Sequence, residues 1–592
     1  MSGCRAVLRL LVTLGLLAVG LCVNPIPANA SAGGSHTWGG SIVISPSTAV
    51  AGSTGNNLAF LYTAPAGADF NGVVTVVVPT SSRPPLNTTG YSPVPASNNV
   101  VVQTSTCKMA SVSSFSTATP AYPGDQPGTQ ISIRANCKGG TQFRMTYGPV
   151  TVPQAPQTYT FYATAGTALA LQPTQTVIPG PAFRLTVAAS TSSTTAGTAF
   201  SVQVRALDAY NNVATSYAGT IHFTSTDTQA SLPADYAFQG TDHGIHTFAA
   251  GAMLKTAGSQ TISGADTVNP LAGSTPPISV APAPASHFDL SAPATTNAGD
   301  AVSVTVTALD PYGNTATSYA QTITFTSSDN QASLPPDYTF DPSTDAGVHA
   351  FTNAAVLRSS GSQTISATDT ADPTVTGTTA GTTVAPGPAT QMSVVILGGA
   401  NAGQRIMAVH VRALDAYGNQ ASGYAGTVHF SSTDPQATLA GDYTFQPGDG
   451  GGKVFSNTFI LRTAGNQTIT ATDTVDASIT GTSDPALVRP SSATHLSISA
   501  PASAATGVPF SLTVTALDAY GNVASGYGGT VTFTSSDAQA TLPPDYTFDP
   551  TTDAGVHTFQ GGATLITPGP QTITASDTAN SAVFGTATID VF

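Results

Sequence analysis

A seven-residue motif recurs at nearly constant spacing in the chain and constrains the fold more than any other sequence feature. Ala-Leu-Asp-Ala-Tyr-Asn-Asn at 206–212 returns as Ala-Leu-Asp-Pro-Tyr-Gly-Asn at 308–314, and as Ala-Leu-Asp-Ala-Tyr-Gly-Asn at 413–419 and 516–522. Successive aspartates of the motif are 102, 105 and 103 residues apart. The segments 326–351 and 534–559 are identical at 22 of 26 positions. Such similarity indicates duplication, so four units of about 100 residues share one fold.

Short proline-containing segments, such as Pro282-Ala283-Pro284-Ala285, separate the copies and predict an array of domains. Linkers this short that contain proline restrict bending, so we expect a semi-rigid rod. The expected organisation is a signal peptide at 1–30, an N-terminal β-sandwich at 31–178, and repeats at 179–282, 283–386, 387–489 and 490–592.

Within each copy the apolar residues alternate with polar ones, which is typical of half-buried strands. In the last copy Phe510, Leu512 and Val514 alternate with serine and threonine. All acidic residues of the chain are Asp, and Lys is nearly absent, so long surface helices are not expected. The sequence therefore predicts an all-β protein of tandem immunoglobulin-like β-sandwiches in an elongated array.

Two local motifs specify turns and core positions. The Gly of Asp-Ala-Tyr-Gly-Asn is expected at positive φ, and the first copy has Asn211 there, the non-glycine residue that tolerates this conformation best. A second motif, Asp-Ala-Gly-Val-His-Thr-Phe at 553–559, resembles the Asp-x-Gly-x-Tyr-x-Cys corner of immunoglobulin domains, with His in the Tyr position. The Phe of this motif is then a core residue in every copy, at Phe248, Phe351, Phe455 and Phe559.

The segment 512–522, followed by Gly-Thr-Val-Thr-Phe-Thr at 529–534 and Gln-Thr-Ile-Thr-Ala at 571–575, resembles the bacterial Ig-like domains of the invasin and intimin group. The resemblance covers all four copies. It implies an extracellular spacer or an adhesin-like role, and it brings no catalytic residues with it.

The first thirty residues have the pattern of an export signal. Arg5 and Arg9 precede an apolar run at 10–23, and Ala-Asn-Ala at 28–30 fits signal peptidase cleavage before Ser31. The alternatives are a membrane anchor, for which the run is short, and lipidation at Cys22, which lacks the expected small residue before it. No later segment is apolar enough to span a bilayer.

Export makes a disulfide the expected state of the two remaining cysteines, Cys107 and Cys137. A bridge over this loop is worth about 3–4 kcal/mol in the chain-entropy model. The alternative is two buried free thiols; a zinc site would need further ligands.

Charge is distributed unevenly along the chain. Residues 31–165 carry a net charge of +3, whereas residues 166–592 carry −19. The N-terminal unit is therefore a candidate contact site for anionic wall polymers or glycans, with an ordinary solvated face as the alternative. The overall charge of −14 argues against nucleic-acid binding.

Metal and catalytic sites have little support. Calcium is the cofactor to consider, because the Asp of each repeated turn offers hard oxygen ligands. The candidate ligands are Asp208, Asp310, Asp415 and Asp518, although an Asp in a turn usually caps its own backbone. His246, His349 and His557 occupy matching positions, but the third copy has Lys453 there, which favours a structural role; His243 and His246 beside Asp242 are a further weak metal candidate.

The complete absence of Glu excludes H-E-x-x-H proteases, EF-hands and glycosidases that use a Glu pair. No catalytic Ser-His-Asp set can be assigned. The sequence therefore predicts a non-enzymatic, secreted or cell-surface structural protein, adhesin-like, in which an Ig-like stalk presents the N-terminal unit. The alternative is a polysaccharide- or cell-wall-binding module, and surface proteins are further candidate partners.

Overall fold

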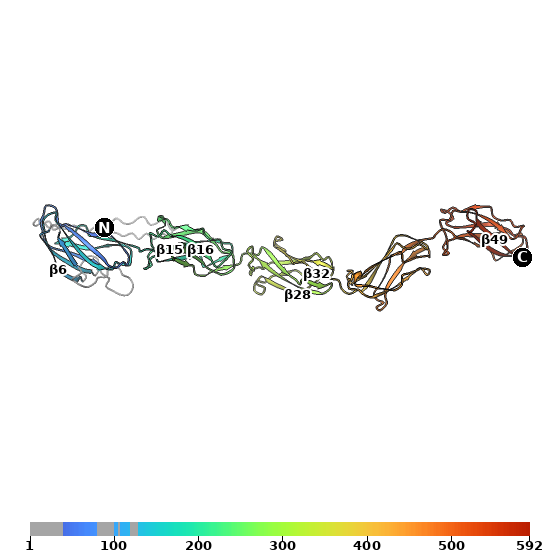
Figure 1. The fold of residues 1–592 in the computed structure, drawn as a ribbon, viewed down its shortest axis with the longest axis horizontal. Helices are drawn as coiled ribbons and strands as arrows, with labels where there is room; N and C mark the ends of the chain where they lie inside the picture. Colours follow the sequence, from blue (N-terminus) through green and yellow to red (C-terminus); the bar gives the residue numbers. More distant parts are fainter. Residues whose placement is uncertain (1–38, 80–99, 105–106, 119–127) are drawn as a thin grey trace, which may run out of the picture.

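The computed structural model describes residues 39–79, 100–104, 107–118 and 128–592. Five β units follow one another along an elongated molecule, with the N-terminal unit at one end and the unit containing Phe592 at the other (Figure 1). The described residues contain no α-helix. The predicted all-β architecture of tandem Ig-like sandwiches is confirmed. The expected signal peptide, residues 1–30, lies outside the described residues.

The N-terminal unit is a β-sandwich with strand orders β1-β3-β8-β5 and β11-β10-β4-β7-β6, joined by a small sheet β2-β12-β9. Its core is aromatic and contains Phe60, Tyr62, Phe143 and Phe161. The strands are β1 (Ser41–Ser45), β2 (Thr48–Val50), β3 (Asn56–Thr63), β4 (Phe70–Pro79), β5 (Val100–Thr104), β6 (Met109–Ala118), β7 (Gly128–Cys137), β8 (Gln142–Val150), β9 (Thr158–Thr160), β10 (Tyr162–Ala165), β11 (Thr167–Ala168) and β12 (Thr174–Ile178).

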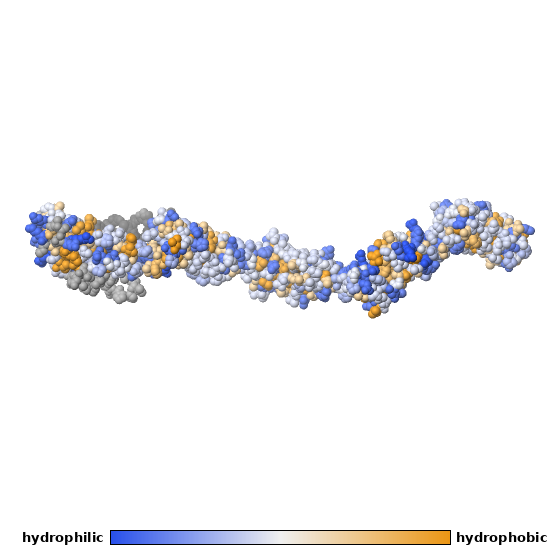
Figure 2. All heavy atoms as spheres, viewed as in Figure 1, coloured by the Kyte–Doolittle hydropathy of each residue, from blue (hydrophilic) through white to orange (hydrophobic). Residues whose placement is uncertain are grey.

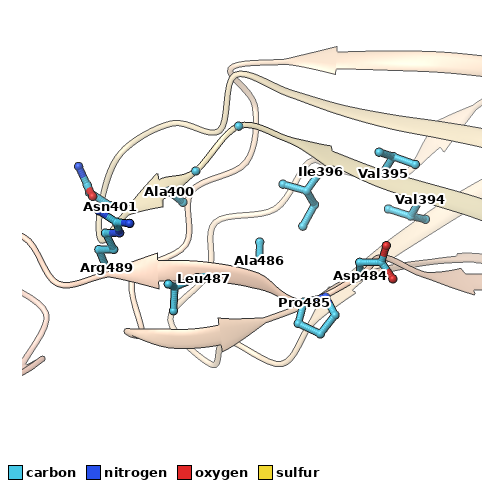
Figure 3. Close-up of a pocket in the computed structure, with 12 residues that line it drawn as sticks. Val394, Val395, Ile396, Ala400, Asn401, Asp484, Pro485, Ala486, Leu487 and Arg489 are labelled. Atoms are coloured by element: carbon cyan, nitrogen blue, oxygen red, sulfur yellow. The ribbon is translucent and has the colours of Figure 1, made fainter.

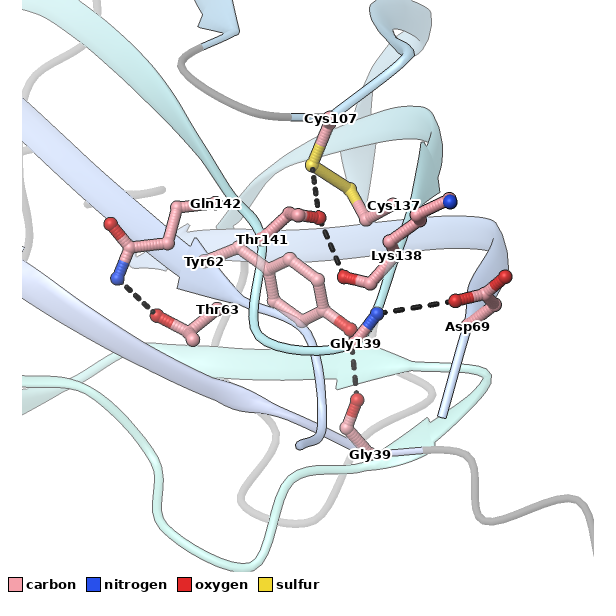
Figure 4. Close-up of a disulfide and its surroundings, with 10 residues drawn as sticks. All are labelled: Gly39, Tyr62, Thr63, Asp69, Cys107, Cys137, Lys138, Gly139, Thr141 and Gln142. Atoms are coloured by element: carbon pink, nitrogen blue, oxygen red, sulfur yellow. Dashed lines mark hydrogen bonds between the residues drawn. A yellow bond between two sulfur atoms is a disulfide. The ribbon is translucent and has the colours of Figure 1, made fainter. Parts of the chain in front are cut away.

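The predicted disulfide between Cys107 and Cys137 is present and ties the start of β6 to the end of β7 (Figure 4). Two hydrogen bonds hold the turn that follows β7. Thr141 Oγ1 donates to the carbonyl oxygen of Lys138 at 2.6 Å, and the amide of Gly139 donates to Asp69 Oδ1 at 3.2 Å. The bridge therefore fixes one end of the N-terminal unit.

Each repeat is also a sandwich, and the second repeat shows why. Along β25 (Ala301–Leu309) Val302, Val304, Val306 and Ala308 are buried while the residues between them face outward, which is the predicted alternation of a half-buried strand. One layer is the sheet β23-β25-β28, and the other combines β24-β32-β29 with β27-β26-β30-β31. β24 and β32 pair in parallel, whereas the other pairs of this repeat are antiparallel.

The first two repeats contain nearly the same set of elements. In repeat 1 they are β13 (Arg184–Ala189), β14 (Ser193–Thr195), β15 (Ala199–Leu207), β16 (Thr220–Ser225), β17 (Tyr236–Ala237), η2 (Gly240–Asp242), β18 (Ile245–Met253), β19 (Gly258–Gln260), β20 (Ile262–Asp266), β21 (Ala272–Ser274) and β22 (Ile278–Ala281). In repeat 2 they are β23 (His287–Ser291), β24 (Thr295–Asn297), β25, β26 (Thr322–Ser327), β27 (Tyr338–Thr339), β28 (Val348–Val356), β29 (Gly361–Gln363), β30 (Ile365–Asp369), β31 (Thr376–Thr378) and β32 (Thr382–Ala385).

The last two repeats keep this order. In repeat 3 the elements are β33 (Gln391–Leu397), β34 (Ala400–Asn401), β35 (Ala408–Leu414), β36 (Thr427–Ser432), β37 (Tyr443–Thr444), η3 (Pro447–Asp449), β38 (Gly452–Ser456), β39 (Gly465–Gln467), β40 (Ile469–Asp473), β41 (Thr480–Thr482) and β42 (Ala486–Arg489). In repeat 4 they are β43 (His495–Ser499), β44 (Ser503–Ala504), β45 (Phe510–Leu517), β46 (Thr530–Ser535), β47 (Tyr546–Thr547), β48 (Val556–Ala563), β49 (Gly569–Asp577) and β50 (Phe584–Val591).

The corner motif packs as predicted. Phe351, Phe455 and Phe559 are buried and Phe248 is half-buried against the core of its repeat. In repeat 2 the ring of His349 stacks on Tyr338 with centroids 3.9 Å apart, and its Nδ1 lies 2.8 Å from Asp345 Oδ1. The histidines at this position therefore have a structural role.

The units have separate cores, but a tyrosine crosses each boundary between repeats. Tyr312 of repeat 2 packs against the core of repeat 1, Tyr417 of repeat 3 against that of repeat 2, and Tyr520 of repeat 4 against that of repeat 3. These tyrosines belong to the repeated seven-residue motif, so the same motif forms a turn in its own repeat and a contact with the repeat before it.

Candidate functional site: the joints between units

The turn from Asp310 to Asn314, which we call the docking turn of repeat 2, is organised around one buried carboxylate. Asp310 Oδ1 accepts hydrogen bonds from the amides of Tyr312 and Asn314, at 2.8 and 2.9 Å. Oδ2 accepts one from Asn314 Nδ2 at 2.8 Å and one from the amide of Ala283, in the linker, at 2.9 Å. The same side chain therefore shapes the turn and anchors the linker to it.

This arrangement stabilises the ionised carboxylate of Asp310. Burial alone would raise its pKa, but the hydrogen bonds from Asn314, Ala283 and Tyr312 outweigh burial and lower the pKa. The turn also needs a left-handed residue between Tyr312 and Asn314, and Gly313 supplies it at φ 84°. In repeat 1 the corresponding Asn211 has φ 70°, as the sequence predicted.

Repeat 1 receives this turn on a surface that we call its docking face. The ring of Tyr312 lies on Gly197, which has φ 81°, and occupies the space where a Cβ at Gly197 would project. Asn314 Nδ2 donates to the carbonyl oxygen of Lys255 at 2.7 Å, and Asn314 Oδ1 accepts from the amide of Ala257 at 2.8 Å. The asparagine side chain thus pairs with the backbone of repeat 1 as a neighbouring strand would.

Two side chains of repeat 1 complete the contact with Tyr312. Gln229 Nε2 donates to the carbonyl oxygen of Tyr312 at 3.3 Å, and the ammonium group of Lys255 lies 6.0 Å from the centre of the tyrosine ring. Tyr312 is therefore held by three contacts: its ring lies on a glycine, its carbonyl oxygen accepts from a glutamine side chain, and a lysine cation lies near its ring.

A second buried aspartate holds the docking face in shape. Asp227 Oδ2 accepts from the amides of Lys255 and Thr256 at 2.6 and 3.0 Å, and its Oδ1 accepts from Thr256 Oγ1 at 2.6 Å. Because Oδ1 also accepts from the amide of Gln229, one carboxylate positions both the loop and the glutamine that contact the next repeat. The joint therefore has one buried carboxylate on each side.

The next two joints repeat these contacts residue by residue. Between repeats 2 and 3, Tyr417 lies on Gly299, and the Arg358 guanidinium is 5.7 Å from the centre of its ring. Asn419 Nδ2 donates to the Arg358 carbonyl at 2.6 Å, and Asn419 Oδ1 accepts from the Ser360 amide at 2.7 Å. Gln331 Nε2 donates to the Tyr417 carbonyl at 3.3 Å. Between repeats 3 and 4, Tyr520 lies on Gly403, and the Arg462 guanidinium is 5.7 Å from the centre of its ring. Asn522 Nδ2 donates to the Arg462 carbonyl at 2.6 Å, and Asn522 Oδ1 accepts from the Ala464 amide at 2.8 Å. Gln436 Nε2 donates to the Tyr520 carbonyl at 3.2 Å.

The joint between the N-terminal unit and repeat 1 uses the same docking turn on a different face. Tyr210 lies on Gly52 and its hydroxyl donates to the Gly52 carbonyl at 3.2 Å, while Asn212 Nδ2 donates to the Gln154 carbonyl at 2.7 Å. Gln154 takes the place of the cation of the other joints. Pro156 takes the place of Ala257 and has no amide hydrogen to donate.

The candidate calcium ligands Asp208, Asp310, Asp415 and Asp518 all lie in docking turns and accept hydrogen bonds from the turn and the linker. Each stands apart from the others, one per joint. Among the described residues no group of three or more His, Cys or Asp side chains could hold a metal ion. Calcium binding at these positions stays a prediction.

Each repeat also has an aspartate near its end, and the sequence did not reveal the partner of this side chain. In repeat 1, Tyr217 donates its hydroxyl to Asp266 Oδ2 in the interior of the sandwich at 2.5 Å. The pKa of Asp266 falls to about 2, because hydrogen bonds from Asn269, Tyr217 and Val268 outweigh the effect of burial. The repeats keep this pair as Tyr319–Asp369, Tyr424–Asp473 and Tyr527–Asp577.

The described basic residues of the N-terminal unit do not gather on one face. Arg134 is exposed on the sheet that contains β7, whereas Arg144 is exposed on the opposite sheet, which contains β8. Lys108 and Lys138 flank the disulfide, and Arg83 lies outside the described residues. Binding of anionic polymers by this unit therefore stays a prediction, because the described part of the unit has no single basic patch to support it.

On the face shown in Figure 2, repeat 3 has hydrophobic and hydrophilic residues side by side. Val395 and Val454 face outward there and are about half exposed. A groove of about 510 Å³ runs between β33 and β42, with Asn401 and Arg489 at one end and Asp484 at the other (Figure 3). The groove contains no arrangement of nucleophile, acid and base.

No helix in the described ranges is both long and apolar enough to cross a bilayer. No protein-family model matches the chain, and no curated protein matches it.

Several solved structures are similar to this chain. FdeC, described as an Escherichia coli adhesin, is 15% identical over 60% of this chain and 100% of its own, with a TM-score of 0.28. Invasin, described as a bacterial integrin-binding protein, is 14% identical over 69% of this chain and 79% of its own, with a TM-score of 0.24. InvD of Yersinia pseudotuberculosis is 12% identical over 58% of this chain and 97% of its own, with a TM-score of 0.27. The similarity concerns the fold alone, and it recovers the invasin-like resemblance predicted from the repeats.

Proposed function

We propose that this chain is a non-enzymatic structural protein of the cell surface or the extracellular space, in which four Ig-like repeats form a stiff, adhesin-like stalk that carries the N-terminal unit. The observation that supports this most is the repetition of one joint between the repeats, with the same tyrosine, asparagine, glycine and glutamine at each boundary. A chain selected only for flexible linkage would not need matched contacts on both sides of every boundary.

The proposed function of the stalk is to hold the N-terminal unit at a distance. Strands of about ten residues at ~3.3 Å per residue, with their loops, give units about 35–45 Å long, so four repeats placed end to end reach roughly 150 Å. Small-angle X-ray scattering of the full chain tests stiffness: the expected result is the profile of an extended rod. A profile that requires a broad ensemble of bent shapes would contradict the proposal.

A shortened stalk tests the function itself. Deleting residues 282–489 joins Ala281 directly to Pro490, which keeps the linker length and leaves repeats 1 and 4 as neighbours. On intact cells the N-terminal unit should then become less accessible to an antibody against it, whereas the full chain remains accessible. Equal accessibility of the two chains, at equal surface amounts, would show that reach is not what the stalk provides.

A further inference from the structure

The fourth repeat has a docking face of its own, built like the other three. Gly507 occupies the glycine position with φ 73°. Asp537 accepts hydrogen bonds from the amides of Ile566 and Thr567, at 2.6 and 2.9 Å, as Asp227 does in repeat 1. Gln539 stands where Gln229, Gln331 and Gln436 stand. The loop, the carboxylate and the glutamine that form a docking face are therefore all present.

This face is open in the described structure. All four docking turns of the chain contact other faces, those with Gly52, Gly197, Gly299 and Gly403. At Gly507 the nearest atom to the position of a Cβ is Ile566 Cδ1, at 3.8 Å, within the same repeat. The place that a tyrosine ring takes on the other glycines is thus accessible.

The residues around the open face are more apolar than their counterparts. Val508, which is 53% exposed, replaces Thr198, Asp300 and Gln404 of the other repeats. Ile566 replaces the cations Lys255, Arg358 and Arg462, and Pro568 replaces Ala257, Ser360 and Ala464. Phe592, at the position where the linker leaves the other repeats, is 73% exposed.

The closest counterpart within the chain is the face of the N-terminal unit. Pro156 there stands at the position of Pro568, and Gln154 supplies no cation, yet the face holds Tyr210 on Gly52 and pairs Asn212 with the Gln154 carbonyl. Loss of the cation and of one amide donor is therefore compatible with docking. The Ile566 carbonyl is the corresponding acceptor in repeat 4.

We propose that the open face of repeat 4 is an interaction site for the docking turn of a further Ig-like unit, one that carries the Asp-x-Tyr-x-Asn pattern. The tyrosine ring lies on Gly507 among Val508, Ile566 and Phe592, and the asparagine donates to the Ile566 carbonyl. The choice of partner follows from continuity with the four occupied faces, which all hold such a turn. The inference rests on the proposed stalk function, and it can fail alone, because an empty fifth face leaves the four internal joints unchanged.

The test extends the full chain by a second copy of residues 490–592, placed directly after Phe592, so that the new linker has the length of the one at Arg489-Pro490. Pulsed dipolar spectroscopy measures the distance distribution between one spin label in repeat 4 and one in the added copy. The reference is the same pair of positions in repeats 3 and 4. We expect a single distribution nearly as narrow as the reference.

Two variants show whether the narrow distribution comes from docking. Gly507→Val fills the ring position, and Tyr520→Ala, made in the added copy alone, removes the ring; each should broaden the distribution. A broad distribution that neither variant changes would overturn the proposal. So would a distribution that becomes narrow only after Ile566→Arg and Pro568→Ala are introduced together, since the native face would then be unable to dock.

Discussion

The joint at the N-terminal unit and the three joints between repeats use one docking turn on two kinds of docking face. Between repeats, the asparagine pairs with both a carbonyl and an amide, a glutamine binds the tyrosine backbone, and a cation lies near the ring. At the N-terminal unit the asparagine pairs with one carbonyl, and the tyrosine hydroxyl with another. The turn is constant, so the receiving face determines how firmly each unit is held.

The two kinds of docking face differ in how firmly they hold the unit that docks on them. The proposed stalk requires a fixed direction from repeat to repeat. Each boundary between repeats has three hydrogen bonds that involve a side chain, two made by the asparagine of the docking turn and one by the glutamine of the docking face. The N-terminal unit keeps the glycine contact and the asparagine bond but has Pro156 and Gln154 where an amide donor and a cation would add to them. We therefore expect its orientation to vary more than that of any repeat.

The largest expected effect falls on the feature that the two kinds of joint share. Asp310→Ala removes the buried carboxylate that accepts from the amides of Tyr312, Asn314 and Ala283, which should cost about 2–4 kcal/mol in the stability of repeat 2. Asp208→Ala should cost a similar amount in repeat 1. Thermal unfolding of the full chain, followed by calorimetry, measures both.

Asp300→Ala is the matched control for this comparison. Asp300 is exposed in the same repeat and accepts one hydrogen bond, from Asn297, so its loss should change stability by less than about 0.5 kcal/mol. If Asp208→Ala were as harmless as the control while Asp310→Ala was costly, the two kinds of joint would differ in their turns as well as in their faces.

The second effect concerns the glycine of the docking face. Gly299→Val places a β-branched residue at φ 90°, which is strained, and puts its Cβ where the ring of Tyr417 lies. The strain is of order 1–3 kcal/mol, so the joint should open and the distance distribution between labels in repeats 2 and 3 should broaden. Gly52→Val should do the same at the N-terminal unit.

The control for the glycine variant lies on the other side of the joint. Gly418→Asn changes a glycine with φ 87° that has open space around it, and repeat 1 carries Asn211 at the corresponding position. The distribution should stay narrow. A distribution broadened equally by both variants would mean that strain in any turn opens the joint, without a specific contact between ring and glycine.

The sequence predicted the turn but not the joint. Asp310, Asn314 and a positive φ at Gly313 follow from spacing and residue type, because all three act within five residues of one another. The role of Tyr312 does not, because its partner Gly197 belongs to another unit, and only the order of units in space brings the two together. The sequence does contain a signal for this contact. In every copy a glycine precedes the motif at nearly constant spacing, at Gly197, Gly299, Gly403 and Gly507.

The interpretation of the aspartates shows the same limit. Residue type alone allows Asp310 to be a calcium ligand or a turn cap, since its oxygens can face a cation or N–H groups. The linker amide of Ala283, which lies 27 positions earlier in the chain, adds a donor that no local pattern reveals. The role of the buried Asp227 in shaping the docking face was missed for a related reason. Its partners, the amides of Lys255 and Thr256, are distant in sequence.

A third effect compares the asparagines of the two kinds of joint directly. Asn419→Ala removes two hydrogen bonds to repeat 2, whereas Asn212→Ala removes one to the N-terminal unit, and both variants lose the same internal bond to aspartate. The difference should be about 1 kcal/mol, or roughly fivefold in the ratio of docked to undocked molecules. Distance distributions across the two joints measure this ratio. Equal losses would show that the amide of Ser360 contributes nothing to docking.

The smallest effect tests the cation. Arg358→Gln copies the residue found at Gln154, and it removes a guanidinium 5.7 Å from the ring of Tyr417 together with its hydrogen bonds to the Gln331 carbonyl and Ser333. An exposed cation near an aromatic face is worth about 0.5–1 kcal/mol, so the joint should loosen slightly without opening.

Arg358→Lys separates the charge from the hydrogen bonds of the guanidinium. It keeps the charge in the form that the first joint between repeats uses, with Lys255 6.0 Å from the ring of Tyr312. If the cation matters, the lysine variant should retain the narrow distribution that the glutamine variant partly loses. If both variants broaden it equally, the arginine acts through its hydrogen bonds to its own repeat, and the firmness of the joints between repeats comes from asparagine and glutamine alone.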